Sequence, residues 1–323
     1  MFDFVIKYRH YFWIPVVILI SIITLKILNT DRWDGRRRFT LAVNADRMLI
    51  FSIEPKTKRA VLLAFPVNTL LDVPFGYGSY PASSVFRLGE LDGKSGGKKL
   101  FIKSIENTFG VTVEGFFGMK SQGMFFLPDN EFNIQTIKQS YFSYMGVVVN
   151  FPKVITLIKS INTNLSIIEA IRLWYAVRSI RGDNIKFLSL EKKNICLENI
   201  QPDGSKLMVI DKDNLDNLIP DYFQDQLIRA EDVSIEIVNA GGKEKLAADF
   251  SRILISMGAN VVSKNTAEQP VPGFCTIYAP SNLIKTSYLV RRIKLLYQCK
   301  VTPEITDDTS ADIRIVLGTE FVK

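Results

Sequence analysis

The chain contains little histidine and cysteine, and this scarcity excludes several kinds of chemistry. Its 323 residues include one histidine, His10, and three cysteines, Cys196, Cys275 and Cys299. No Cys-x-x-Cys motif occurs, so the sequence predicts no zinc site. A histidine-dependent triad is also excluded, because His10 lies beside an apolar N-terminal segment. Cys275 falls in a predicted strand and Cys299 near a predicted helix end. We expect two buried free thiols there, with a disulfide outside the cytoplasm as the alternative.

Several ligand-binding and catalytic motifs are missing as well. The glycine-rich stretches Gly76–Gly78 and Gly93–Lys99 lack the Gly-x-x-x-x-Gly-Lys-Ser/Thr spacing of a nucleotide-binding loop. No Gly-x-Ser-x-Gly elbow is present. The net charge of +7 would suit nucleic acid, anionic lipid or a phosphate-bearing polymer. Without a helix-turn-helix signature, we expect no nucleic-acid partner, and dispersed lysines on a solvated surface also explain the charge.

One apolar segment near the N-terminus is long enough to cross a membrane. Residues Tyr11–Leu28 are apolar apart from Lys26 and a few small polar residues, and a spanning helix needs about 20 apolar residues. No small-residue cleavage site follows, which favours an uncleaved anchor over a signal peptide; a buried soluble helix is the alternative. Lys7 and Arg9 precede the segment and Arg36–Arg38 follow it, so charge alone does not decide its orientation.

The last ninety residues show a regular alternation of predicted strands and helices. From Val233 to Phe321 the order is strand, turn, helix, strand, strand, helix, strand. With the phrases Ser-Ile-Glu-Ile-Val-Asn-Ala-Gly-Gly and Ile-Val-Leu-Gly-Thr-Glu-Phe, this region resembles the LytR C-terminal domain of bacterial envelope proteins. We expect a ferredoxin-like βαββαβ unit with a four- or five-stranded sheet and helices over 243–257 and 282–297. The residues expected to be buried are Leu246, Phe250, Ile253, Ile293 and Leu296.

The second of those helices also carries several cations. Lys285, Arg291, Arg292 and Lys294 are expected on a solvated face. Contact with an anionic wall polymer is the alternative.

Upstream, the patterns predict a mixed sheet. Strands are expected at 39–43, 48–53, 60–65 and 111–117, with a helix over 100–109 after Gly96-Gly97. This order, with Asp46 after the first strand and Pro66-Val67-Asn68-Thr69 after the third, resembles the LytR-CpsA-Psr domain. That family has arginine and aspartate where this chain has Val67 and Asn68.

A second group of matches lies further along. Arg178 fits the family's Arg-x-Arg helix, Arg181 is displaced by one position, and Asp183 answers a downstream aspartate. Lys186, Ser189 and Leu190 stand where the family has a basic cluster. A surface set of salt bridges is the alternative explanation of these charges.

The resemblance implies a site for a phosphorylated glycopolymer. The family moves such a polymer from a polyprenyl pyrophosphate to peptidoglycan with magnesium. The resemblance therefore implies that Asp46 is a metal ligand. It implies that the ligand-binding residues are Arg178, Arg181, Asp183 and Lys186. The catalytic candidates are Asp46, Arg178 and Arg181. An arginine clamps phosphate with two parallel hydrogen bonds, which a valine cannot form. We therefore expect a non-catalytic binding or scaffold protein, with an active magnesium-dependent phosphotransferase as the alternative.

The predicted organisation is an α/β (α+β) protein with four parts. Residues 1–38 are a cytoplasmic stub, transmembrane anchor and linker, and 39–211 are the LytR-CpsA-Psr-like domain. Residues 212–230 are a connector, and 231–323 are the LytR C-terminal-like domain. The expected location is the cell membrane, with a single pass and external C-terminal domains. Expected partners are the membrane and a wall glycopolymer or polyprenyl-phosphate lipid.

Overall fold

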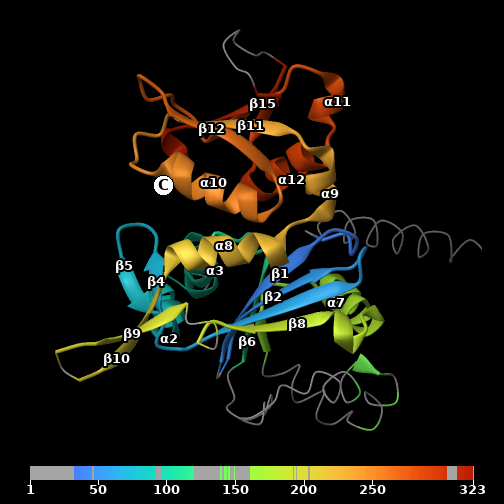
Figure 1. The fold of residues 1–323 in the computed structure, drawn as a ribbon, viewed down its shortest axis with the longest axis vertical. Helices are drawn as coiled ribbons and strands as arrows, with labels where there is room; N and C mark the ends of the chain where they lie inside the picture. Colours follow the sequence, from blue (N-terminus) through green and yellow to red (C-terminus); the bar gives the residue numbers. More distant parts are fainter. Residues whose placement is uncertain are drawn as a thin grey trace, which may run out of the picture.

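A computed structural model describes most of the chain. It covers residues 33–119 except 46, 92, 94 and 95, and residues 161–322 except 192, 194, 203 and 304–310, with five single residues between 139 and 149. Within these ranges no helix is both long and apolar enough to cross a membrane. The predicted anchor at 11–28 lies outside the described residues. Figure 1 shows two units, one above the other, with helix α8 between them.

The first unit is built on a six-stranded mixed sheet in the order β7-β6-β1-β2-β3-β8. Its strands are β1 (Phe39–Asn44), β2 (Met48–Glu54), β3 (Arg59–Phe65), β6 (Gly115–Met119), β7 (Ile161–Thr163) and β8 (Ile185–Ser189). Strands β1, β2 and β3 form an antiparallel meander, whereas β8 runs parallel to β3 and β6 parallel to β1. The three predicted strands of the meander are confirmed. The predicted strand at 111–117 begins only at Gly115.

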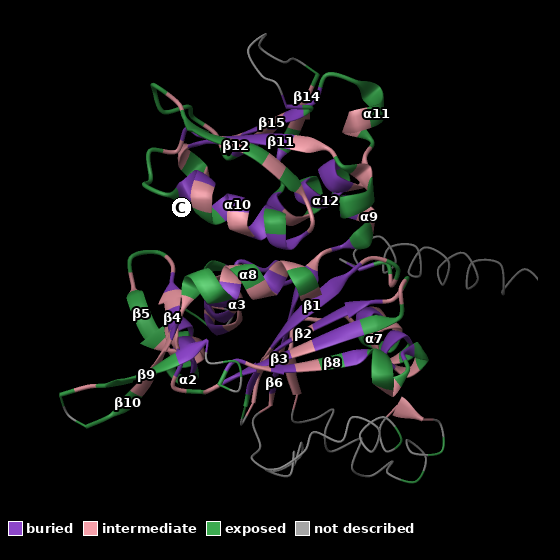
Figure 2. Ribbon diagram, in the orientation of Figure 1, coloured by how far each residue is buried: buried purple, intermediate pink, exposed green. Residues whose placement is uncertain are grey.

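Each face of this sheet carries its own apolar core, because successive strand residues point to opposite faces. Helices α2 (Ala82–Glu90) and α3 (Gly96–Phe109) pack on one face around Phe101 and Phe109. Helix α7 (Ile167–Ser179) packs on the other, against Trp33. Figure 2 shows the buried strands between these layers. The Gly96-Gly97 pair has a packing role, since a Cβ at Gly97 would lie 2.6 Å from a backbone oxygen of α2.

Shorter elements complete the first unit. Two small antiparallel sheets are formed by β4 (Leu70–Val73) with β5 (Gly78–Pro81), and by β9 (Cys196–Ile200) with β10 (Lys206–Ile210). Helices α8 (Lys212–Phe223) and α9 (Gln226–Glu231) follow. Leu215 and Ile219 of α8 belong to the first core, whereas Ile228 of α9 belongs to the core of the second unit.

The second unit has a five-stranded sheet in the order β12-β11-β15-β13-β14. Its elements are β11 (Ser234–Asn239), α10 (Leu246–Ser256), β12 (Asn260–Thr266), β13 (Cys275–Tyr278), α11 (Asn282–Lys285), α12 (Tyr288–Tyr297), β14 (Lys300–Thr302) and β15 (Ile313–Leu317). Helices α10 and α12 lie together on the side of the sheet that faces the first unit (Figure 1).

The ferredoxin-like order predicted for this unit is wrong. In that order the sheet is antiparallel and another strand separates each pair of helix-linked strands. Here β11 and β12 are adjacent and parallel, and so are β13 and β14. Strand β14 was also missed in the sequence, because its three residues are too few to show a hydrophobic period. With β14 at the edge, β15 inserts between β11 and β13.

The predicted core of the second unit is largely confirmed. Leu246, Phe250, Ile253 and Ile293 are buried, and Leu296 is half-buried against the same cluster. The expectation of free thiols at Cys275 and Cys299 is wrong, because the two form a disulfide with a Cα–Cα distance of 4.6 Å. The register of β13 and β14 explains the bond: Thr276 is paired with Lys300, so the two preceding cysteines are adjacent.

Candidate functional site

The loop that carries Val67 and Asn68 follows the C-terminal end of β3. It comprises Pro66, Val67, Asn68 and Thr69, and it is held by the first turn of α2. The backbone N–H of Ser83 donates to the Val67 carbonyl (3.0 Å), and that of Ala82 donates to the Thr69 carbonyl (2.9 Å). Thr69 is fully buried, whereas the Val67 side chain is partly exposed. The loop is thus fixed by the start of α2, and Val67 presents an apolar surface to the solvent.

The β9–β10 hairpin covers this loop from the other side. The Asn68 side-chain amide donates to the Lys206 carbonyl at 2.7 Å, and the Met208 N–H donates to the Asn68 carbonyl at 3.2 Å. Thr69 and Met208 also form a parallel β-bridge. Cys196 of the same hairpin is a buried free thiol, and burial raises its pKa to about 11, so it stays protonated and unreactive near neutral pH. Asn68 therefore has a structural contact at the position where the resemblance implies an acid.

Restoring the family's aspartate at this position should be unfavourable. In Asn68→Asp a carboxylate would face the Lys206 carbonyl, and neither group can donate a hydrogen bond. We expect a loss of about 1 kcal/mol in the free energy of unfolding, which should shrink at acidic pH as the carboxyl becomes protonated and can donate. Chemical denaturation at two pH values would measure this loss. Asn68→Ala is the matched control, since it removes the same bond without adding a charge and should show no such pH dependence.

The basic residues predicted to bind a ligand lie at the other end of the sheet. In the parallel pair β3–β8, Val61 is opposite Lys186 and Ala64 is opposite Ser189. Val61 lies four residues before Phe65, the last residue of β3, which corresponds to about 13 Å of strand, and Val67 follows beyond that end. Arg181 and Asp183 precede β8 and are therefore at the same end as Lys186. The structure does not bring these residues to the loop that carries Val67 and Asn68.

The residues of this basic group either contact other parts of the protein or face the solvent. Arg178 is half-buried at the end of α7; its guanidinium lies 5.7 Å from the Trp174 ring centroid and donates to the Phe142 carbonyl at 3.5 Å. Arg181, Asp183 and Lys186 are exposed. Leu190, which stands in the family's basic cluster, is fully buried in the first core. Leu190 is therefore part of the core and not of a ligand-binding surface.

The predicted metal ligand, Asp46, lies outside the described residues. Its flanking strands place the β1–β2 turn beside Phe65, since Met48 is paired with Phe65. The turn is therefore at the end of the sheet that carries Val67, away from Lys186. Over the described ranges, no three histidine, cysteine, aspartate or glutamate side chains gather as a metal site would require. Magnesium binding at Asp46 stays a prediction.

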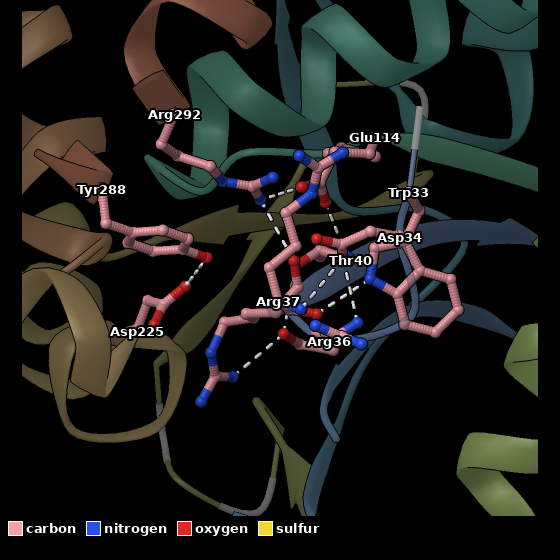
Figure 3. A network of polar contacts seen from close by, with 12 residues as sticks. Trp33, Asp34, Arg36, Arg37, Thr40, Glu114, Asp225, Tyr288 and Arg292 are labelled. Atoms are coloured by element: carbon pink, nitrogen blue, oxygen red, sulfur yellow. Dashed lines mark hydrogen bonds and ion pairs between the residues drawn. The ribbon is translucent and has the colours of Figure 1, made fainter. Parts of the chain in front are cut away.

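A network of buried polar contacts lies between the two units (Figure 3). Arg292 of α12 forms a buried ion pair with Glu114, which follows α3, and also donates to the Arg38 carbonyl at 3.1 Å. The other oxygen of Glu114 accepts from the Thr40 N–H at 2.7 Å. Arg292 was expected on a solvated face, but only 4% of it is exposed. That expectation is wrong. The sequence of α12 could not show the burial of Arg292, because its partner Glu114 lies 178 residues earlier in the chain.

A second part of the network surrounds Arg38. Its guanidinium contacts Glu54 of β2 at 3.3 Å and donates to the Tyr222 carbonyl at 3.1 Å. The Tyr288 hydroxyl donates to Asp225 at 2.8 Å. Burial raises the pKa values of Asp225 and Tyr288, and it lowers those of Arg38 and Arg292. Both guanidiniums nevertheless remain charged at neutral pH, because arginine titrates far above it.

A third contact joins the units through the connector. Arg252 of α10 holds Asp216 of α8 with two bonds of 2.6 and 2.7 Å, and it also donates to the Asn107 carbonyl at 3.2 Å. Neither Arg252 nor Asp216 was singled out from the sequence. Their chemistry is that of a fixed interface rather than of a reaction centre, since each charge is matched by a protein partner.

Comparisons with known proteins agree with the motifs. Residues 232–321 match the family described as LytR cell envelope-related transcriptional attenuator. A stretch of 101 residues is 26% identical to the polyisoprenyl-teichoic acid–peptidoglycan teichoic acid transferase TagU of Oceanobacillus iheyensis. That match covers 31% of this chain and 29% of the relative, so it spans less than a third of that protein.

Solved structures similar to this chain include TagT of Bacillus subtilis, with 14% identity and a TM-score of 0.38 over 58% of this chain and 89% of that one. Another is a LytR-CPS2A-psr family protein, YwtF (TagT), with bound octaprenyl pyrophosphate lipid. It has 17% identity and a TM-score of 0.37 over 57% of this chain and 89% of that one.

The second unit is therefore a LytR C-terminal domain, as the sequence predicted. The predicted resemblance to LytR-CpsA-Psr envelope proteins is likewise confirmed. The class that the family match defines for this unit is that of cell envelope-related proteins.

Proposed function

We propose that this chain is a membrane-anchored envelope protein that binds a wall glycopolymer or its polyprenyl-phosphate carrier without transferring it. The observation that carries this proposal is the state of the loop after β3. Val67 and Asn68 replace the arginine and aspartate of the family, and Asn68 is bonded to the β9–β10 hairpin. The remaining basic candidates lie at the opposite end of β3.

The energetics favour a binding role over a catalytic one. A pyrophosphate transition state needs cationic donors held close to the developing charge, and one missing donor of this kind costs on the order of 10²–10³ in rate. Exposed Arg181 and Lys186 can attract an anionic headgroup, but they lie far from the Val67 loop. Binding without turnover is the expected result of separating these groups.

The disulfide supports an external location for the folded units. Cys275 and Cys299 are bonded within the second unit. Structural disulfides form and persist in oxidising compartments and are rare in the cytoplasm. With the apolar segment 11–28 as an anchor, the proposed arrangement is a single pass with both units outside the membrane.

The test is turnover and binding by the full chain in lipid nanodiscs. A polyprenyl-pyrophosphate-linked glycopolymer is supplied with peptidoglycan and magnesium, and transfer is followed by release of the lipid pyrophosphate. We expect no transfer above the protein-free rate. A fluorescent polyprenyl pyrophosphate should still bind, with affinity reduced in Arg181→Ala.

The matched control for binding is Arg291→Ala, which removes an exposed arginine from the second unit and should leave affinity unchanged. Magnesium-dependent transfer that is abolished by Asp46→Ala would establish the alternative, an active phosphotransferase. Equal loss of binding in both arginine variants would point to unspecific charge attraction.

A further inference from the structure

Helix α7 has an apolar face that is open to solvent. Ile167, Ile171 and Tyr175 are 81%, 60% and 65% exposed. They are spaced four residues apart, so they form one stripe along the helix. Trp174 borders this stripe and is half-buried. A contiguous row of large exposed apolar side chains indicates an interaction surface, whereas scattered single ones are normal on any protein.

The opposite face of the helix is firmly packed, so the stripe is not a sign of a loose helix. Ala176 and Val177 belong to the core that contains Trp33 and Phe39. The N-terminus of α7 has a capping box: Ser166 accepts from the Glu169 N–H at 3.1 Å, and Glu169 accepts from the Ser166 N–H at 2.9 Å. The helix is rigidly held, and its exposed stripe has a defined direction.

The start of the described chain is attached to this same helix. The Trp33 N–H donates to Glu169 at 3.1 Å, and Arg172 donates to the Trp33 carbonyl at 2.6 Å. Trp33 itself is fully buried. It is the fifth residue after Leu28, the last residue of the apolar segment. Five residues span at most about 18 Å, so in the proposed arrangement the part of α7 that contacts Trp33 lies within that distance of the end of the anchor.

The charges near α7 suit an anionic surface. Arg36 next to the attachment point, and Arg181 and Lys186 after the helix, are exposed, and Arg178 lies at the helix end. Two exposed acids, Asp34 and Asp183, oppose them. The surplus is positive, and tyrosine and tryptophan beside an aliphatic stripe are the residues favoured at the headgroup level of a membrane.

We propose that the Ile167–Ile171–Tyr175 face of α7 lies in the headgroup region of the bilayer that holds the N-terminal segment. The occupant of this face is a lipid surface with anionic headgroups. This inference rests on the membrane anchor of the proposed function. It adds an orientation: the first unit stands on the membrane through α7, which keeps Arg181 and Lys186 at the lipid headgroups.

The test measures the surroundings of α7 in the full chain, at one copy per nanodisc. A nitroxide label is placed on Ile171→Cys, and its collision rates with oxygen, which concentrates in lipid, and with a water-soluble nickel chelate are compared. We expect oxygen collisions to dominate at position 171 in phosphatidylglycerol nanodiscs. Leu283→Cys is the matched control, because Leu283 is 83% exposed on α11 of the second unit and should favour the nickel chelate.

The other outcomes separate this inference from the anchor. If position 171 resembles position 283 while carbonate washing leaves the protein in the membrane pellet, the anchor stands and the α7 inference is overturned. Release by carbonate removes the anchor and overturns both. Loss of nickel access at 171 without a gain in oxygen access would show that protein covers the stripe, which also overturns it. Unchanged thermal unfolding of the labelled variant confirms that the helix is intact.

Discussion

Replacing Glu114 by glutamine should destabilise the protein by about 3–5 kcal/mol, the usual effect of removing one partner from a buried ion pair. The carboxylate of Glu114 accepts from both Arg292 and the Thr40 N–H. An amide has only one acceptor oxygen, so its NH₂ group would face either a guanidinium or a backbone donor. The Arg292 charge would also stay buried without a counter-charge.

Urea unfolding followed by circular dichroism would measure this effect. The control is Asp72→Asn, which breaks the exposed Lys212–Asp72 pair and should change stability by no more than about 1 kcal/mol. In the double variant Glu114→Gln/Arg292→Met, much of the loss should be recovered, because an apolar side chain has no charge to leave unpaired. A loss below about 1 kcal/mol in Glu114→Gln would show that Arg292 finds another partner.

Removing the Cys275–Cys299 disulfide should destabilise the second unit by about 3–4 kcal/mol. The bond joins residues separated by 24 positions, and closing a loop of that length lowers the entropy of the unfolded chain by a corresponding amount. Strand β14 should be affected most. It has three residues, begins directly after Cys299, and pairs only with β13 in the described sheet.

Unfolding midpoints with and without a reductant would test this prediction. The midpoint should fall on reduction in the unaltered protein and in Cys196→Ala, whose buried thiol is not part of the bond. In Cys275→Ala/Cys299→Ala it should be low in both conditions. A midpoint that does not respond to reductant in the unaltered protein would contradict a stabilising role for the bond.

Much of the local structure could be read from the sequence. The meander over 39–65 was predicted because its apolar runs have strand length and a proline-containing turn separates two of them. The core positions of α10 were predicted from helical spacing, and four of the five residues predicted to be buried in the second unit are buried. Periodicity succeeds here because it reports which side of an element avoids water.

The arrangement of the candidate site could not be predicted from periodicity in the same way. Val67 and Lys186 looked like parts of one degraded site because both fall in family motifs. The register of β3 and β8 sends them to opposite ends of the sheet, and that register joins strands about 120 residues apart in sequence. Likewise, helical spacing places Arg292 one turn from Leu289 and Leu296, but spacing alone does not show that a charged side chain there is buried.

The sequence by itself therefore determined the three strands of the meander, the core positions of α10 and the LytR C-terminal domain. These are local properties, encoded by residues that are neighbours in the chain. Only the tertiary structure decided the strand order of the second sheet, the pairing of Cys275 with Cys299, and the burial of Arg292 on Glu114. Each of these depends on which distant segments meet, and contact between distant segments is set by the packing of the whole chain rather than by the pattern of any one segment.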